Sequence, residues 1–333
     1  MQTTLGKIVG LGLLASLTTA ALAHHSPARF RVDQVVAITG TVERVDWTNP
    51  HTYFFVKDEA DRTWRLEANA TSILRRAGWQ PETVTVGDTV TVRANPPRSD
   101  SSNHGRLLSL VAADGRVLST SSEALAPGDA EPRATTSLAG TWRGNAKEAF
   151  KFLFAFIDHP LTERGEQAVA EFDDTLDPIA ACETWPTPRL TAWTAFYLSE
   201  IELGDEIVTI TNEFGRAERT IYLDGREHPS SAQHFPQGFS IGHWEDDVLV
   251  VDTRNFTENR SPIADGIPSS PERRVVERFR LDDDGTRLHI HLQVFDPVYL
   301  AEPFDATLTW QYSPTLSIEP FDCDPEIARR FLD

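Results

Sequence analysis

The stretch VVAITGTV, residues 35–42, decides the fold of the first third of this sequence. β-Branched residues dominate it, and that composition predicts a β-strand. Segments of similar character follow, and a short helix separates the third predicted strand from the fourth. The predicted strands cover residues 35–42, 52–56, 63–67, 89–93 and 107–112, and the predicted helix covers 71–77, with Thr71 or Ser72 as its cap. Five strands with one helix in this place are typical of an OB-type barrel.

The chain after Pro188 contains short alternating segments separated by turn residues, which predicts antiparallel β-structure. Upstream, Gly140-Thr141-Trp142 is similar to the opening signature of lipocalin-like barrels. The predicted strands cover residues 198–203, 207–212, 219–223, 239–244, 248–252, 274–281, 288–295 and 307–312. We therefore expect a mainly β protein, in which a small OB-like barrel precedes a larger antiparallel, lipocalin-like β-barrel or bent sheet.

Two segments before Pro188 differ from this β-pattern: one fits either a strand or a helix, and the other is predicted to be a helix. Phenylalanines alternate at positions 150, 152, 154 and 156, but the residues between them are also mostly apolar. The pattern in 150–157 fits a strand and a buried helix equally well. Thr162 is a good helix cap, and a helix is expected from there to about Phe172.

The first 23 residues have the pattern of a signal peptide. Lys7 precedes an apolar run over residues 8–17, and Ala21 and Ala23 supply the small residues that a signal peptidase accepts. The run is shorter than the roughly 20 residues that span a bilayer. We expect cleavage after Ala23, a periplasmic or secreted protein, and no membrane span after cleavage.

Residues 119–137 are rich in Ser, Ala, Pro, Gly and Glu and show no periodicity. That composition predicts a linker between domains. The expected organisation is a signal peptide at 1–23, an OB-like domain at 24–118, the linker, and a barrel-like domain at 138–333.

Acidic residues outnumber basic ones in the chain. There are 31 Lys and Arg against 50 Asp and Glu, which gives a formal net charge of −19. The sequence contains no basic run suited to a phosphate backbone, so we expect no nucleic-acid partner.

The two cysteines, Cys182 and Cys323, are expected to form a disulfide. An exported protein reaches an oxidising compartment, where a lone pair of cysteines is more often bridged than free. A catalytic thiol is the alternative, and no Cys-x-x-Cys motif supports it.

Two groups of motifs resemble families of exported bacterial proteins. The first group is Ala23-His24-His25-Ser26, Gly40-Thr41-Val42, Trp47, Asn49-Pro50-His51, Gly78-Trp79 and Val86-Gly87-Asp88. It resembles an uncharacterised family whose members start Ala-His-His-Ser and contain Asn-Pro-His. The second group is Tyr222 to Arg226, Ser240 to Glu245 and Leu249 to Thr253. It resembles a second set of uncharacterised exported domains. Both resemblances imply a fold without an assigned activity.

A mature chain that begins at His24 would offer a copper site. The α-amine and Nδ1 of an N-terminal histidine chelate one metal, and a further imidazole completes a T-shaped set of three nitrogens suited to Cu(II). His51, in Asn49-Pro50-His51, is the expected third ligand, with Asn49 holding its ring. A rival mode uses the amine together with the amide and imidazole of His25. The alternative without metal is a frayed terminus with two solvated histidines.

A second candidate site is the mouth of the larger barrel. Ser240, His243, Trp244 and Glu245 lie close together in sequence and could contact a small ligand there. In the alternative reading, Trp244 plugs the barrel and the acidic residues after it form a solvated turn.

Two other motifs favour structural interpretations. Gly-x-Ser-x-Gly at 238–242 fits the nucleophile elbow of hydrolases, but a second strand follows where the elbow requires a helix. His289 and His291 share one face of a predicted strand, and the apolar residues that alternate with them point to the core. These histidines are therefore expected on the outside.

The leading interpretation is an exported binding or accessory protein, with His24 and His51 as candidate copper ligands. A lipocalin-like carrier of a small apolar ligand is the first alternative, and an enzyme with its site at the barrel mouth is the second. An unfilled apolar interior would favour the carrier, and convergent polar groups in a cavity would favour the enzyme.

Overall fold

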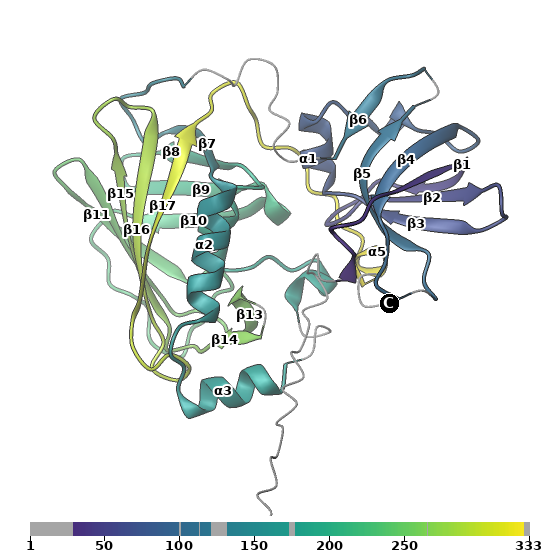
Figure 1. Cartoon of the computed structure of the whole chain (residues 1–333). Helices are drawn as coiled ribbons and strands as arrows, with labels where there is room; N and C mark the ends of the chain where they lie inside the picture. Colours follow the sequence, from purple (N-terminus) through teal and green to yellow (C-terminus); the bar gives the residue numbers. More distant parts are fainter. Residues whose placement is uncertain are drawn as a thin grey trace, which may run out of the picture.

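The computed structural model describes residues 29–99, 101–112, 114–120, 132–172, 177–264 and 266–329. It contains two closed β-barrels, joined in sequence around residues 120–139 (Figure 1). The predicted mainly β fold class is therefore confirmed. Residues 1–23 and the histidines His24 and His25 lie outside the described residues.

The first barrel has the strand order of an OB fold. Its five strands form a sheet in the order β3-β2-β1-β4-β5, and a parallel pairing of β3 with β5 closes it. α1 lies between the third and fourth strands, as predicted, and β6 extends the sheet beyond β5. The elements are β1 (Val36–Asp46), β2 (Tyr53–Asp58), β3 (Thr63–Glu67), α1 (Thr71–Arg76), η2 (Pro81–Thr83), β4 (Thr89–Asn95), β5 (His104–Val111) and β6 (Val117–Ser119).

Alternation along β1 explains why this barrel closes around an apolar core. Ile38 and Val42 are buried, whereas their neighbours in the strand are largely exposed. Gly40 shares their face, and a Cβ there would collide with the backbone carbonyl of Lys57 on β2. Trp79 is fully buried, and its indole N–H donates to the Ser119 carbonyl at 2.8 Å. The sheet therefore extends to the position where the linker was expected to begin.

The second barrel has nine strands in the closed order β10-β11-β12-β15-β16-β17-β7-β8-β9. Its neighbouring strands are antiparallel except β10 and β11, which form a short parallel pair. The connection over 223–238 is long enough for the crossover that parallel strands need. The strands are β7 (Gly140–Gly144), β8 (Ser199–Leu203), β9 (Ile207–Asn212), β10 (Ala217–Tyr222), β11 (Phe239–Glu245), β12 (Val248–Arg254), β15 (Arg274–Leu281), β16 (Arg287–Phe295) and β17 (Phe304–Tyr312).

Several shorter elements complete the fold. They are α2 (Ala146–Ile157), α3 (Glu163–Ala170), η4 (Pro178–Ala181), α4 (Arg189–Trp193), η5 (Phe214–Arg216), the hairpin β13 (Asn259–Ala264) and β14 (Ile267–Ser269), and α5 (Pro325–Ala328). α3 begins after Thr162, whose hydroxyl accepts a hydrogen bond from the Gly165 N–H at 3.1 Å. The predicted cap is correct, and the helix ends two residues before the predicted end.

The ambiguous segment 150–157 belongs to a helix, α2. The Asn145 side chain caps it by accepting from the Lys147 and Glu148 N–H groups. Phe152 and Phe156, one turn apart, are buried in the barrel's apolar cluster, whereas Phe150 and Phe154 are exposed. The alternation of phenylalanines in sequence thus reflects two faces of a helix rather than two faces of a strand.

The C-terminal segment returns to the first barrel (Figure 1). The Asp322 carbonyl accepts hydrogen bonds from the backbone N–H of Asn49 at 2.9 Å and from the Thr48 hydroxyl at 3.1 Å. Cys323 is bonded to Cys182, with 5.9 Å between their Cα atoms and 141 positions between them in sequence. The predicted disulfide is present, and it ties this returning segment to the part of the chain before β8.

A buried ion pair joins the two barrels. Arg76, at the end of α1, donates from both terminal nitrogens to the Glu213 carboxylate, at 2.8 and 2.9 Å. Glu213 is fully buried, and it also accepts from the Glu319 N–H at 2.9 Å. Apolar residues from both barrels, including Ile73 and Phe214, form one cluster beside this pair. The two barrels are therefore in direct contact through buried side chains.

Loss of the disulfide is expected to lower the stability of the protein. A Cys182→Ser/Cys323→Ser variant should lose about 2–5 kcal/mol of unfolding free energy, because the bond closes a long loop in the unfolded chain. Urea unfolding of the variant and of the oxidised protein measures the difference. The reduced wild-type protein is the matched control and should resemble the variant. Identical midpoints for oxidised and reduced protein would contradict the prediction.

Removal of the Glu213 carboxylate is expected to uncouple the barrels. In Glu213→Ala, Arg76 loses its buried partner, which costs about 3–5 kcal/mol. Scanning calorimetry should show two separated transitions where the wild-type protein shows one. Arg62→Ala, which removes an exposed pair with Asp58, is the control and should shift stability by less than about 1 kcal/mol. A single unshifted transition in Glu213→Ala would argue against this role.

Candidate functional site

The Asn-Pro-His motif lies in the connection between β1 and β2, at the edge of the first barrel. Asn49 is fully buried, and its side chain accepts from the Thr71 N–H at 3.1 Å and donates to the Asp322 carbonyl at 3.2 Å. It therefore fixes the start of α1 and the returning C-terminal segment. The expectation that Asn49 holds the ring of His51 is therefore wrong. The N-cap of α1 was predicted at Thr71 or Ser72, and it is Ala70.

A backbone carbonyl orients the ring of His51. Its Nδ1 lies 3.1 Å from the Ala68 carbonyl oxygen, which can only accept a hydrogen bond, so Nδ1 is the protonated nitrogen. In the neutral ring Nε2 carries the lone pair, and no described residue bonds it. The side chain is about one quarter exposed, at 28%. This is the arrangement that fixes a histidine as a metal ligand in metalloproteins.

A second histidine, His104, lies close to His51 and shares its acidic neighbour. Glu67 places one carboxylate oxygen 3.6 Å from His51 Nδ1 and the other 3.0 Å from His104 Nε2. Arg65 donates to His104 Nδ1 at 3.1 Å, which makes Nε2 the protonated nitrogen that faces Glu67. His104 is buried and fully engaged, so its role in this arrangement is to position Glu67.

Phe30, near the start of the described residues, lies beside His104. The ring of Phe30 packs edge-on against His104, with 5.3 Å between centroids. The backbone there pairs with residues 96–98. His24 lies outside the described residues, six positions before Phe30, and six extended residues reach at most about 20 Å. Among the described residues, no group of three His, Cys, Asp or Glu side chains is placed to hold a metal ion.

The four residues expected at the barrel mouth lie on different faces of β11. Ser240 is buried inside the barrel. His243 and Glu245 are exposed on the outer face, where His243 Nε2 lies 3.2 Å from Glu245 Oε1 and Arg278 also bonds Glu245. Trp244 is 43% exposed at the end of the strand. The structure therefore does not bring these four residues into one site, and their ligand-binding role stays a prediction.

The interior of the second barrel holds an ion pair that the sequence analysis missed. Arg219 and Glu277 lie 2.5 Å apart, and neither side chain is more than 7% exposed. Arg219 also donates to the hydroxyls of Ser240, Thr253 and Thr187. A signal was present in the sequence, because both charged residues occupy inward positions of their strands, between buried apolar residues.

α4 enters this interior and occupies the centre of the barrel. The Thr191 hydroxyl donates to Glu277 at 3.0 Å, and its carbonyl accepts from the Trp310 indole at 3.1 Å. The cavity beside these residues has a volume of about 20 Å³, room for one water molecule. Ligand sites measure roughly 300–1,000 Å³. The described interior of this barrel is therefore filled at the place where lipocalin barrels hold a ligand. This argues against the alternative in which the protein carries a small apolar ligand.

The remaining motifs take structural roles. Ser240 lies within a strand that continues into a hairpin, and its hydroxyl bonds Arg219 and Thr253 rather than a histidine. The nucleophile elbow is therefore absent at this position. His289 and His291 face outward on β16, as predicted, and the leucine and isoleucine residues between and beside them are buried.

One buried cation lies near the end of the barrel, ahead of β15. Arg273 is almost fully buried, with its guanidinium 3.9 Å from the centroid of the Phe256 ring. Burial lowers its pKa to about 9, and the nearby Asp296 opposes that shift. The aromatic ring and the carboxylate of Asp296 thus both stabilise this buried charge.

Comparison with known proteins gives a family for the N-terminal part of the chain. Residues 12–106 match a family of unknown function, DUF6152. This is consistent with the resemblance of the first third to an uncharacterised family. No curated protein matches the chain. In the described residues, no helix is long and apolar enough to cross a membrane.

Two solved structures are among those similar to the chain. A mutant of the fluorescent protein UnaG is 12% identical, with a TM-score of 0.25, over 53% of this chain and 96% of that one. A luciferase domain from the dinoflagellate Lingulodinium polyedrum is 13% identical, with a TM-score of 0.26, over 59% of this chain and 48% of that one. The chain thus spans about half the length of the luciferase domain. Neither likeness carries a functional inference.

The buried pair in the second barrel is expected to be structural. Glu277→Gln leaves the Arg219 charge without its partner and should cost about 3–5 kcal/mol of unfolding free energy. The double variant Arg219→Met/Glu277→Leu removes both charges and should regain most of this loss. Urea unfolding measures both. Wild-type stability of Glu277→Gln would contradict a structural role and would favour a functional carboxylate instead.

Proposed function

We propose that this chain is an exported binding or accessory protein that holds a copper ion through His24 and His51. Cleavage after Ala23 makes His24 the N-terminal residue, and its α-amine and Nδ1 form the chelate. His51 supplies the third nitrogen. The observation that carries the proposal is the orientation of His51, whose Nδ1 bonds a backbone carbonyl while Nε2 has no described partner.

Nitrogen ligands explain the choice of metal. Imidazole and amine donors in a square or T-shaped arrangement suit Cu(II) better than Mg²⁺ or Ca²⁺, which prefer oxygen. A histidine that is fixed through its other nitrogen loses little freedom on binding, which favours affinity. Glu67 lies 3.6 Å from Nδ1 of the same ring, on the side away from Nε2, and its negative charge increases the basicity of the imidazole.

The position of Phe30 supports the same assignment. Phe30 packs on His104, and His104 shares Glu67 with His51. Six positions separate His24 from Phe30 in sequence, and six extended residues span at most about 20 Å. The rival mode, in which the amide and imidazole of His25 replace His51, needs no contact with the barrel. The two modes therefore predict different effects of the same substitutions.

Export is part of the proposal. The disulfide between Cys182 and Cys323 is the kind of bond that persists in an oxidising compartment. A binding role is preferred over catalysis, because the enzyme alternative relied on a cluster at the mouth of the barrel that the structure disperses. A periplasmic or secreted accessory protein that binds copper fits these observations together.

Copper affinity is expected to depend on where the chain begins. One glycine added before His24 converts the amine to an amide and should weaken Cu(II) binding by at least about tenfold, because one ligand is lost. His51→Ala should weaken binding similarly. Competitive titration against a chelator of known affinity measures both. Affinity should also fall as the pH drops below about 8, where the α-amine gains a proton.

Two controls separate the binding modes. His243→Ala removes an exposed histidine elsewhere and should leave copper affinity unchanged. His25→Ala should have little effect if His51 is the third ligand, and a large effect in the rival mode. Equal affinities for the glycine-extended and native-start proteins would rule out the N-terminal site altogether.

A further inference from the structure

We propose that a pocket at the start of α2 binds a small molecule that carries two or more anionic groups, phosphate or carboxylate. The pocket lies where the end of β7 leads into the first turn of α2, beside β16 and β17. Its volume is about 600 Å³, within the roughly 300–1,000 Å³ of small-molecule sites. It is separate from the proposed copper site, and the two can be tested independently.

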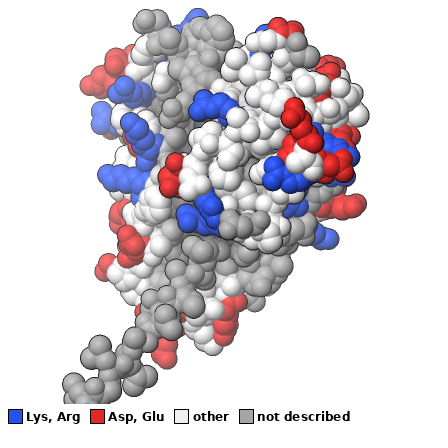
Figure 2. All heavy atoms as spheres, turned by 45° about the vertical axis from the view of Figure 1, so that its right-hand side comes forward, with Lys and Arg blue, Asp and Glu red and all other residues white. Residues whose placement is uncertain are grey.

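The charge of the pocket is opposite to that of the chain. Its lining includes four basic side chains, Arg133, Arg143, Lys147 and Arg287, and one acidic side chain, Glu148. The whole chain has 31 basic and 50 acidic residues. On the face drawn in Figure 2, Lys and Arg are interspersed with Asp and Glu, and uncharged surface lies between them. A group of four cations around one acid is therefore a local reversal of sign.

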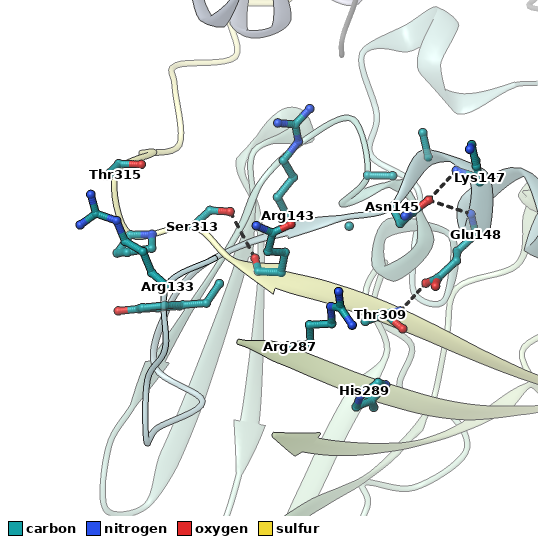
Figure 3. Close-up of a pocket in the computed structure, with 16 residues that line it drawn as sticks. Arg133, Arg143, Asn145, Lys147, Glu148, Arg287, His289, Thr309, Ser313 and Thr315 are labelled. Atoms are coloured by element: carbon teal, nitrogen blue, oxygen red, sulfur yellow. Dashed lines mark hydrogen bonds between the residues drawn. The ribbon is translucent and has the colours of Figure 1, made fainter. Parts of the chain in front are cut away.

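The single acid is already engaged by the backbone. Glu148 Oε2 accepts a hydrogen bond from the Thr309 N–H at 2.7 Å, which fixes the start of α2 against β17 (Figure 3). Asn145 accepts from the Lys147 and Glu148 N–H groups and caps the same turn. Glu148 thus holds the helix in place, and its one negative charge balances at most one of the four cations.

Three of the four cations are not held in salt bridges with other described residues, although Asp284 is near enough to Arg287 to interact with it electrostatically. Arg133, Lys147 and Arg287 form no salt bridge within the described part of the chain, whereas most exposed arginines on neighbouring strands do. The α2 N-terminus adds the positive end of a helix of twelve residues. Cations gathered this way repel one another, and an anion that enters among them relieves the repulsion.

The cations lie on different sides of the pocket, which favours a ligand with more than one anionic group. Figure 3 shows Arg133 on one side of the pocket, Lys147 on the other, and Arg143 and Arg287 between them, each from a different element. Arginine forks bind the planar or tetrahedral oxygens of carboxylate and phosphate with two hydrogen bonds. A ligand with two separated anionic groups can contact both sides of the pocket, whereas a single-group ion cannot.

Calorimetric titration of the metal-free mature protein tests the proposal. The probes are pyrophosphate, citrate and orthophosphate, at low salt and again at higher salt. We expect pyrophosphate, citrate or both to bind, more tightly than orthophosphate and more weakly as salt rises. Binding of pyrophosphate alone would identify a phosphate ligand, and binding of citrate alone a carboxylate ligand.

Substitutions locate the binding. Arg143→Gln and Arg287→Gln should each weaken binding by about tenfold, since each removes a charge-assisted contact. Arg280→Gln removes a charge from β15, outside the pocket lining, and is the matched control with unchanged affinity. Circular dichroism checks that the variants fold. No saturable binding of pyrophosphate or citrate, or equal weakening in the control, would overturn the proposal.

Discussion

The Glu213 carboxylate is the contact on which the arrangement of this protein depends. It is fully buried, yet it receives a guanidinium from the first barrel and a backbone N–H from the C-terminal segment. A buried charge is tolerable only when its hydrogen bonds are complete, so all three parts of the chain must be in place together. Burial of Tyr197 raises the pKa of its hydroxyl, and the neighbouring negative charge of Glu213 raises it further. This interface is therefore part of the folded core rather than a docking contact.

In neither barrel does the interior hold the candidate site, although the fold of the larger barrel suggests that it would. The larger barrel has the shape associated with ligand storage, but α4 and the Arg219–Glu277 pair fill its centre. Its candidate ligand site lies outside the interior, where a helix begins beside two strands. The smaller barrel has a compact apolar core around Trp79, and its candidate metal ligand lies in a loop at the edge. In both barrels the interior stabilises the fold, and the proposed sites lie at the ends of strands.

Much of the fold could be predicted from local pattern. Alternation located the strands of both barrels within a few residues, because one face of each strand is buried. The count of two cysteines predicted their pairing. The phenylalanines at 150–156 were ambiguous, because a helix that buries every fourth residue and a strand that buries every second residue both suit that spacing. Asn49 was misassigned because its partners, Thr71 and Asp322, are distant in sequence.

The candidate sites were harder to predict than the fold. His51 could be identified because the motif around it is short and local. The four residues around Trp244 were grouped by their proximity in sequence, although alternation along a strand places neighbours on opposite faces. The cationic pocket could not be found from sequence, because Arg133, Lys147 and Arg287 come from segments that only the closed barrel brings together.

The returning C-terminal segment constrains the order in which the first barrel can be completed during synthesis. Thr48 leaves the ribosome 274 positions before Asp322, the residue whose carbonyl it contacts. During that interval the loop with Asn49 and His51 has no partner to complete it, although the five strands around it are already present. The strands of the first barrel are synthesised early, but the loop at its edge gains its C-terminal partner only late. A chain that is interrupted before residue 322 would therefore present an unfinished loop to proteases and chaperones, and the completed edge requires that synthesis has passed this residue.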